Sequence, residues 1–457
     1  MVIQNFDQIK HVNMLKSAHR QITQYEQTQK PTFEAAQAYY NVGKLEECEQ
    51  VVLELQKNDM VTKAVKKLQQ NIEIQKLQIS EGKYDYKSMV EEAKANFVVK
   101  CQNYVNPNIE IREAGKKRFG YFAKSKIEMG TLIMVEKAFV VGSIDQMFEQ
   151  LQVKNILKDS QVQQYLFLRG GDSSLNQLQN LIQKFDKNGF ASFPKLEDEL
   201  VKHDFQEYDT LIIGSSLFNH SCLSNAFWYF IGDVQFIVTQ RDILCNEQIT
   251  LQYIDPQQSF VNYQYKIEQK FGFMCECNMC QSITKQQTEQ LTRLEDILKI
   301  KVKSAENKAE NNIITNDDIE SINNICQRVT NIFDESQAPR NGLSYFYTEL
   351  AHVCLNHKNS KTRYFDIGIK ALECYGIDGE QARIGKLVMK PHAQHFMNFQ
   401  VIRQLMNMLQ YCKFANTSKN EINNWLKVID LVFTKITGGC GDFKYYLKTS
   451  LSENGVK

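Results

Sequence analysis

Apolar residues recur at helical spacing along the first 100 residues of the chain. The clearest case is segment 31–48, where one predicted helix face gathers the apolar residues Ala35, Ala38, Tyr39 and Val42. Pro31 suits the first turn of this helix, and Gly43 can end it in a left-handed backbone conformation. The pattern therefore predicts a helical hairpin here and an α-helical region over residues 1–100.

The apolar period changes to that of β-strands after residue 107. Residues 108–112 alternate between apolar and polar, and the basic, glycine-punctuated loop 114–123 leads into a strand. A strand, a glycine turn and a second strand follow over residues 127–136. Residues 141–210 return to helical spacing, so we expect a helical insert within a β-rich core.

Helical spacing also dominates the chain after Cys280. Apolar residues recur with this period in the segments 283–305, 317–333, 343–357, 362–375 and 400–411. These segments predict an α-helical C-terminal domain over residues 283–457, without indicating a site. The predicted fold class is therefore α+β, a β-rich core flanked by N- and C-terminal α-helical regions.

The composition limits the classes of protein to which the chain can belong. Its 457 residues, 43% of them hydrophobic, are enough for two or three structural units. A formal charge of +1 gives no general attraction to nucleic acid or to a membrane. Residues 1–7 lack the features of a secretory signal, and no apolar run approaches the roughly 18 residues that cross a bilayer. We expect an intracellular protein of the nucleus or cytoplasm.

Three of the 12 cysteines, Cys275, Cys277 and Cys280, form a Cys-x-Cys-x-x-Cys cluster, and Cys222 lies upstream beside an Asn-His pair. Without an export signal, such cysteines favour reduced thiols and metal binding over disulfides. Four thiolates can hold one tetrahedral, structural zinc ion. The alternative is that these are unrelated buried or redox cysteines. The remaining cysteines are expected to be small buried hydrophobes: Cys48, Cys101, Cys245, Cys326, Cys354, Cys374, Cys412 and Cys440.

Residues 217–280 resemble the second half of a SET domain with its post-SET zinc site. The resemblance is carried by Asn219-His220-Ser221-Cys222, by Tyr253-Ile254-Asp255, and by the run from Phe271 to Cys280. The loop 114–123 and the strands of 127–136 resemble the opening of the same domain. The resemblance implies a split SET core at 106–282, with a pseudoknot-like threading and a post-SET site at about 271–282.

SET domains are the signature of protein lysine methyltransferases that use S-adenosyl-L-methionine. The resemblance therefore implies methyl transfer to a lysine of a protein substrate, with S-adenosyl-L-methionine and structural Zn²⁺ as cofactors. Tyr253 matches the catalytic tyrosine, and an ordinary core tyrosine is the alternative. The positions that match cofactor contacts are Lys117, Gly120, Tyr121, Asn219, His220 and Phe273. Phe271 and Tyr253 are expected in the substrate pocket, and a packed structural role is the alternative for His220.

The sequence departs from the family pattern at three positions. Arg118 replaces one glycine of the opening Gly-x-Gly, and Ser224 replaces a proline that fixes a backbone torsion in many relatives. Phe271 stands where some relatives place a second active-site tyrosine, and loss of that hydroxyl is expected either to change how many methyl groups are added or to reduce activity. The substrate protein and the degree of methylation stay open.

The flanking segments place the chain within the broader family. Segment 31–48 resembles a tetratricopeptide-like hairpin, for which an ordinary helical bundle is the alternative. No cysteine occurs between Cys101 and Cys222, so the zinc-binding MYND module of one SET branch is missing. The resemblance therefore favours a branch with helical repeats before the SET core, whose helices can bind protein partners.

Two other functions compete with this prediction. A degenerate SET core could act as a non-catalytic scaffold that binds proteins through its helical regions, but the presence of Tyr253 and Asn219 favours an enzyme. A zinc-ribbon nucleic-acid binder is disfavoured, because no basic face with stacking aromatics flanks the cysteine cluster.

Overall fold

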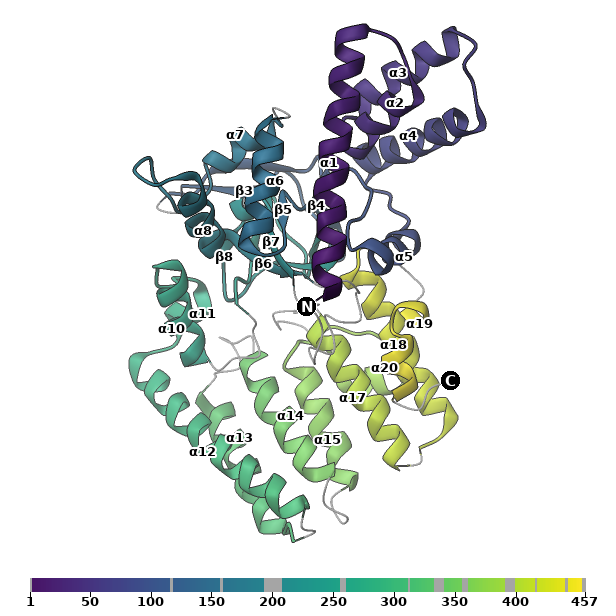
Figure 1. Cartoon of the computed structure of the whole chain (residues 1–457). Helices are drawn as coiled ribbons and strands as arrows, with labels where there is room; N and C mark the ends of the chain where they lie inside the picture. The colour runs from purple at the N-terminus through teal and green to yellow at the C-terminus, as the bar shows by residue number, and fades with distance from the viewer. Residues whose placement is uncertain are drawn as a thin grey trace. The chain divides into compact units, whose positions relative to one another are not determined.

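The computed structural model of the chain has a mixed α+β fold with helices at both ends (Figure 1), which confirms the predicted fold class. It describes residues 2–115, 118–156, 159–192, 208–254, 260–310, 313–332, 341–355, 361–390, 399–415, 417–439 and 443–453. The chain divides into two compact units. Unit 1 comprises Met1–Ile109, Leu132–Leu217 and Trp228–Ile237, and unit 2 comprises Glu110–Thr131, Phe218–Phe227 and Val238–Lys457.

Unit 1 begins with five helices. These are α1 (Val2–Thr28), α2 (Phe33–Asn41), α3 (Leu45–Lys57), α4 (Lys63–Glu81) and α5 (Tyr86–Asn96). Thr32 caps α2 by accepting the backbone N–H of Ala35 at 3.1 Å. Gly43, in the turn to α3, has the predicted left-handed conformation with a φ of 78°. Small residues such as Ala36 are fully buried where α2 packs against its neighbours, so the predicted helical hairpin is present.

A four-stranded sheet follows, in the order β1-β4-β10-β9. Its strands are β1 (Tyr104–Val105), β4 (Leu132–Lys137), β9 (Ala226–Ile231) and β10 (Val234–Thr239). Strand β4 carries the buried Glu136, whose carboxylate accepts the backbone N–H groups of Gly214 at 2.8 Å and Ser215 at 3.0 Å. Burial raises the pKa of Glu136 to about 7, although these hydrogen bonds oppose the shift.

The insert contains a second sheet that the helical pattern did not predict. Strands β5 (Val140–Val141), β6 (Gly189–Ser192) and β7 (Tyr208–Leu211) pair antiparallel in the order β5-β7-β6. The predicted helices are also present: α6 (Ile144–Ile156), α7 (Gln161–Leu166) and α8 (Gln177–Asn188). Met147 and Leu181 are fully buried with Leu211 in one core, so the insert is a mixed layer of helices and strands.

Two short strand pairs lie mainly in unit 2. Strands β2 (Ile109–Glu113) and β3 (Phe119–Ala123) form one pair. Strand β8 (Asn219–His220) and strand β11 (Thr250–Leu251) form the other, which is parallel, with Asn219 opposite Thr250. The Ile249 N–H donates to the Tyr121 carbonyl at 2.8 Å and so ties β3 to the start of β11. These contacts bring together three segments that are far apart in the sequence: strand β3, strand β8 and residues 249–251.

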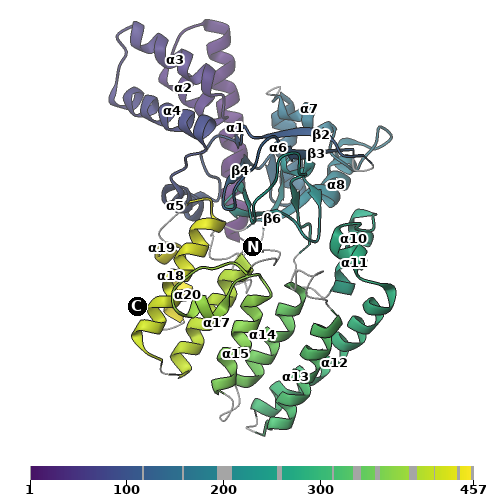
Figure 2. The same cartoon turned by 180° about the vertical axis from the view of Figure 1, so that it is seen from behind.

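The rest of unit 2 is helical (Figure 2). Its helices are α10 (Phe260–Phe271), α11 (Asn278–Ser282), α12 (Lys285–Glu310), α13 (Asn316–Ile332), α14 (Asn341–Leu355), α15 (Lys361–Glu373), α16 (Gly379–Arg383), α17 (Phe399–Ala415), α18 (Lys419–Ile436), α19 (Phe443–Tyr446) and α20 (Lys448–Glu453). Each helix from α12 to α15 packs against the next, as do α15 with α17 and α17 with α18. Leu350, Leu372 and Trp425 are fully buried in this array.

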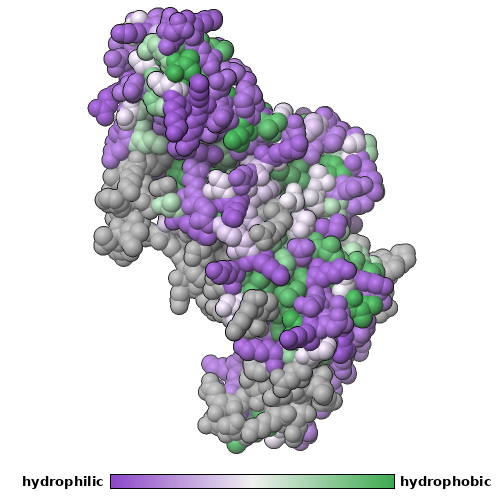
Figure 3. Space-filling model, turned by 90° about the vertical axis from the view of Figure 1, so that its right-hand side faces the viewer, coloured by the Kyte–Doolittle hydropathy of each residue, from purple (hydrophilic) through white to green (hydrophobic). Residues whose placement is uncertain are grey.

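The surface of the chain carries both hydrophobic and hydrophilic residues. On the face in Figure 3, hydrophobic residues lie in scattered groups among hydrophilic ones. Among the described helices, none combines the length and apolar character that a bilayer crossing requires.

The prediction that Cys245 is buried is wrong: it is exposed, because it lies in the tight turn beside Asn246, whose φ is 65°. Cys440 lies outside the described residues.

Candidate active site and metal centre

The parallel pairing of β8 with β11 brings Tyr253 against residues 218–220. The Tyr253 backbone N–H donates to Nδ1 of His220 at 3.2 Å, and its hydroxyl donates to the Phe218 carbonyl at 2.6 Å. Asn219 and His220 are buried, and Tyr253 is half-buried. The backbone and the phenol of Tyr253 are thus both fixed to the same segment, and the hydroxyl is directed into the protein.

Gly120 lies where two side-chain amides meet the backbone of β3. The Asn219 amide donates to the Phe119 carbonyl at 2.8 Å, and a Cβ at position 120 would lie 2.6 Å from its nitrogen. The same Cβ would overlap Nε2 of Gln248, so a larger residue here would require both side-chain amides to shift. Nε2 of Gln248 is buried and has no hydrogen-bond partner among the described residues. A polar ligand atom beside Gly120 can satisfy this donor.

Tyr121 and Arg118 are two further residues of the opening loop 114–123 that the structure describes. The buried ring of Tyr121 packs 4.3 Å from the ring of Phe218, the residue whose carbonyl accepts the Tyr253 hydroxyl. Arg118 is exposed and has a left-handed φ of 66°, a conformation that glycine adopts without strain. Lys117 lies outside the described residues.

Phe271 and Phe273 close the site from the C-terminal side. Phe271 ends α10 and Gly272 follows it with a left-handed φ of 74°, and both phenylalanines pack in one cluster with Tyr253 and Cys222. The ring centroid of Tyr253 lies 4.9 Å from that of Phe271, and the centroid of His220 lies 6.0 Å from that of Phe273. The structure therefore brings the predicted aromatic residues into one cluster.

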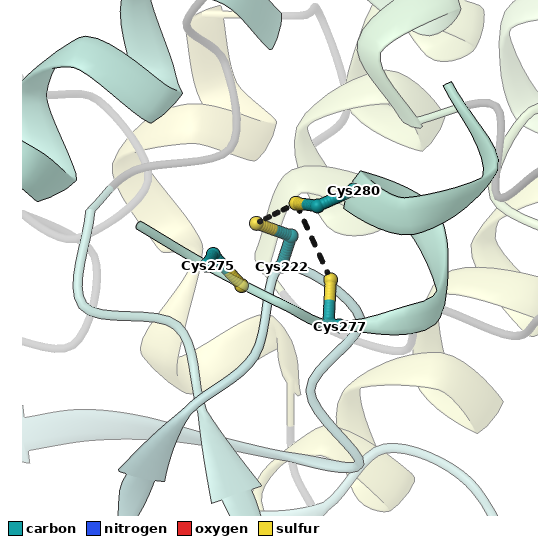
Figure 4. A group of neighbouring side chains, drawn as sticks. All are labelled: Cys222, Cys275, Cys277 and Cys280. Atoms are coloured by element: carbon teal, nitrogen blue, oxygen red, sulfur yellow. Dashed lines mark hydrogen bonds between the residues drawn. The ribbon is translucent and has the colours of Figure 1, made fainter. Parts of the chain in front are cut away.

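The four cysteines of the predicted metal set lie together beside this cluster (Figure 4). Their sulfur atoms are all within 4.8 Å of one another, with Cys222 at 3.4 Å from Cys280, and Cys277 at 3.5 Å from Cys280. Cys222 follows β8, Cys275 and Cys277 precede α11, and Cys280 lies in α11. These separations are far longer than the roughly 2.05 Å of a disulfide. The arrangement can hold one metal ion.

The sulfurs compete for protons when no cation shares the site. Hydrogen bonds from Cys222 lower the pKa of Cys275 and bring the pKa of Cys277 down to about 6. The contact with Cys275 in turn raises the pKa of the Cys222 thiol. Four adjacent thiolates are therefore stable together only when a cation offsets their charge.

Three further side chains, which the sequence interpretation did not single out, support the centre. Gln264 of α10 donates an amide N–H to the sulfur of Cys280. Gln252 donates to the Cys222 carbonyl at 2.8 Å, and Asn225 accepts the Thr250 N–H at 2.8 Å. The only sequence signal for Gln264 is its helical spacing from Ile267 and Phe271, which places the three on one face of α10.

The chain is similar to known proteins over part of its length. Residues 118–254 match the family model of the SET domain, so the chain carries a SET domain in this region. SET domain-containing protein L678 of Acanthamoeba polyphaga mimivirus is 24% identical over 197 residues, which cover 36% of this chain and 74% of that protein. A Gibberella zeae protein named methyltransferase is 22% identical over 305 residues, covering 55% of this chain and 42% of its own length.

Two further similarities are more limited. Histone-lysine N-methyltransferase ATXR4 of Arabidopsis thaliana is 36% identical over 69 residues, which cover 15% of this chain and 21% of that protein. The crystal structure of the SET domain of LSMT bound to lysine and AdoHcy is 12% identical and covers 81% of this chain and 95% of its own, with a TM-score of 0.23.

Proposed function

We propose that this chain is a methyltransferase that uses S-adenosyl-L-methionine to methylate lysine side chains of proteins. The observation that carries the proposal is the position of Tyr253, whose hydroxyl is fixed to the Phe218 carbonyl next to Asn219 and His220. The SET domain at residues 118–254 supports it, as do relatives named methyltransferase and histone-lysine N-methyltransferase.

Tyr253 is the proposed catalytic residue. S-adenosyl-L-methionine supplies an electrophilic methyl group on a sulfonium, which a neutral lysine amine must attack in line. The task of the protein is therefore to orient the amine and exclude water. Because the Tyr253 hydroxyl donates its proton to the Phe218 carbonyl, its oxygen acts as an acceptor. It can accept an N–H of the substrate amine and so direct the nitrogen lone pair.

The contacts beside β3 support a cofactor site there. Gly120 lets the side-chain amides of Asn219 and Gln248 approach the backbone of β3, and the buried Gln248 amide offers a donor that a polar cofactor atom can use. We assign cofactor contact to Lys117, Gly120, Tyr121, Asn219, His220 and Phe273, as the family resemblance implies. Phe271 is assigned with Tyr253 to the substrate pocket, because the two rings are in contact.

Zinc is the metal that best fits the cysteine centre. Four sulfurs around one Zn²⁺ at about 2.3 Å lie about 3.8 Å apart, close to the 3.4 and 3.5 Å found between adjacent pairs. Cys222, Cys275, Cys277 and Cys280 would fill every coordination position, so the ion would be structural. It would fasten residues 271–280 to the end of β8, and with them the two phenylalanines of the aromatic cluster.

The flanking helices have a separate proposed role. The resemblance of segment 31–48 to a tetratricopeptide-like hairpin supports this role, as do the helices that pack side by side in the C-terminal region. Such arrays present extended surfaces for other proteins. We assign binding of the substrate protein or of partners to these regions.

Two measurements test the proposed function: binding of S-adenosyl-L-methionine and transfer of its methyl group to proteins. Calorimetry of the purified chain with S-adenosyl-L-methionine should show one site per chain. Incubation with methyl-labelled cofactor and a whole-cell protein extract should place label on lysine residues of specific proteins. Binding without transfer to any protein would instead support a non-catalytic scaffold, and the absence of binding would refute both the cofactor and the reaction.

A further inference from the structure

The sulfur of Cys222 is contacted by two side-chain nitrogens from outside the cysteine motif. Nε2 of His220 lies 3.4 Å from it, and Nε2 of Gln264 lies 3.9 Å from it. Gln264 also donates to the sulfur of Cys280. The two side chains come from different elements, β8 and α10. They therefore approach the sulfur of Cys222 independently.

The hydrogen bond at the other ring nitrogen determines which nitrogen of His220 carries the proton. Nδ1 accepts the backbone N–H of Tyr253 at 3.2 Å, so this nitrogen carries no proton. A neutral imidazole then has its proton on Nε2, which faces the sulfur of Cys222. The buried ring thus bridges the Cys222 sulfur and the backbone of Tyr253.

The Gln264 amide turns its N–H group toward the sulfurs of Cys280 and Cys222. Its Oε1 is buried and has no hydrogen-bond partner in the part of the chain that the structure describes. The reversed amide would place this oxygen against Cys280 and Cys222, where two acceptors would repel each other if the sulfurs are thiolates. The observed orientation therefore suits a centre of thiolates, which accept N–H groups.

Such donors matter because a zinc ion with four thiolates keeps a net charge of about −2. Cys222 and Cys275 are buried, and Cys277 and Cys280 are half-buried, so water offsets little of this charge. Hydrogen bonds from outer residues to metal ligands commonly change metal affinity by about 10–100-fold.

We propose that Gln264 and His220 are positioning residues of the metal centre, and that His220 couples the centre to the backbone of Tyr253. The metal part rests on the observed contacts and on the proposed zinc. Only the consequence for Tyr253 rests on the proposed function. Neither residue belongs to the cysteine motif, so the centre extends beyond its ligands.

The first experiment measures metal loss to a chelator from the zinc-loaded full chain. Gln264→Leu removes the donor and should speed release about tenfold, and Gln264→Glu, which adds repulsion, should speed it further. The exposed Gln269, on the same helix, provides the matched control Gln269→Leu, which should release zinc at the wild-type rate. Circular dichroism of the loaded variants checks that they remain folded. Wild-type release from both folded Gln264 variants would overturn the role of Gln264.

The second experiment follows the Tyr253 amide by NMR of ¹⁵N-tyrosine-labelled protein. Replacing zinc by cadmium should shift this resonance in the wild type, because His220 links it to Cys222. In His220→Asn, which can still accept at the Nδ1 position without reaching Cys222, the shift should be lost. In His220→Gln, whose amide reaches the Nε2 position, metal release should stay closer to wild type than in His220→Asn. An equal cadmium shift in wild type and His220→Asn would overturn the coupling.

Neither readout needs methyl transfer, so the two proposals can fail separately. A chain that shows these metal effects but transfers no methyl group would refute the proposed function and leave this inference standing. A chain that transfers methyl groups without these metal effects would do the reverse.

Discussion

The hydroxyl of Tyr253 donates a 2.6 Å hydrogen bond to the backbone carbonyl of Phe218. Phe218 directly precedes β8, so the phenol is fixed to the segment that also carries Asn219 and His220. The position of the hydroxyl therefore depends on the parallel pairing of β8 with β11, which joins residues far apart in the sequence.

Tyr253→Phe should slow methyl transfer without weakening the binding of the cofactor. The ring contacts with Phe271 and His220 stay, but the acceptor for the substrate amine is lost. We expect methyl transfer to fall about 100-fold or more, with cofactor affinity by calorimetry nearly unchanged. Tyr265→Phe is the control, because Tyr265 is 63% exposed on α10. Full activity in Tyr253→Phe would remove this residue from the mechanism.

Cys277→Ser should empty the metal centre. Loss of one of four thiolates should lower zinc affinity more than about 100-fold and lower the unfolding temperature, since metal binding is coupled to folding. Elemental analysis and thermal unfolding measure the two effects, and chelation of the wild type should reproduce the second. Cys245→Ser, at the exposed cysteine, should keep one zinc per chain. Retention of zinc by Cys277→Ser would contradict the four-sulfur centre.

Gly120→Ala tests the close approach beside β3. The added Cβ would overlap the amides of Gln248 and Asn219, so we expect a loss of about 1–3 kcal/mol in the free energy of unfolding. Cofactor affinity should fall as well. The double variant Gly120→Ala with Gln248→Ala makes room for the methyl group and should recover part of the stability in denaturant titrations. Unchanged stability of Gly120→Ala would show that the two side-chain amides can move aside.

Arg118→Gly should stabilise the chain. Arg118 has a φ of 66°, a region that costs residues with a side chain about 1 kcal/mol relative to glycine. A denaturant titration should therefore show a rise of that order in the free energy of unfolding. Lys124→Gly, at an exposed position without a left-handed φ, should instead destabilise the chain. A loss of stability in Arg118→Gly would mean that the arginine side chain makes a compensating contact.

Glu136 should make stability depend on pH. Its pKa is raised from 4.5 to about 7 by burial, so the folded chain keeps a proton that the unfolded chain loses as pH rises above 4.5. Its contribution to stability is therefore fully present below pH 4.5 and is lost as pH rises to about 7, by at most about 3 kcal/mol. Denaturant titrations of Glu136→Gln over this range should show a weaker decline than the wild type. An identical decline would assign the dependence to other groups.

The sequence predicted those features that depend on local pattern or on a known motif. Helical periodicity was sufficient for the flanking helices, and the spacing of Cys275, Cys277 and Cys280 pointed to a metal set whose sulfurs the structure brings together with Cys222. The assigned roles of the site residues stay predictions until tested.

The missed features depend on tertiary contacts. Strands β5, β6 and β7 have only two to four residues each, too few to show a period among the helices of the insert. Gln264 has no motif, and its role follows only from the packing of α10 beside the cysteines. Burial of Cys245 was predicted from residue type alone, whereas its turn geometry decides its exposure.

The contact between Cys222 and Cys280 spans 58 positions of sequence. During synthesis, the centre cannot assemble until Cys280 has left the ribosome, although the region that matches the SET family, residues 118–254, has emerged earlier. A truncated product that ends between these points would keep the family signature in its sequence while lacking Phe271, Phe273 and three of the four sulfurs. Such a product would therefore carry only part of the proposed site.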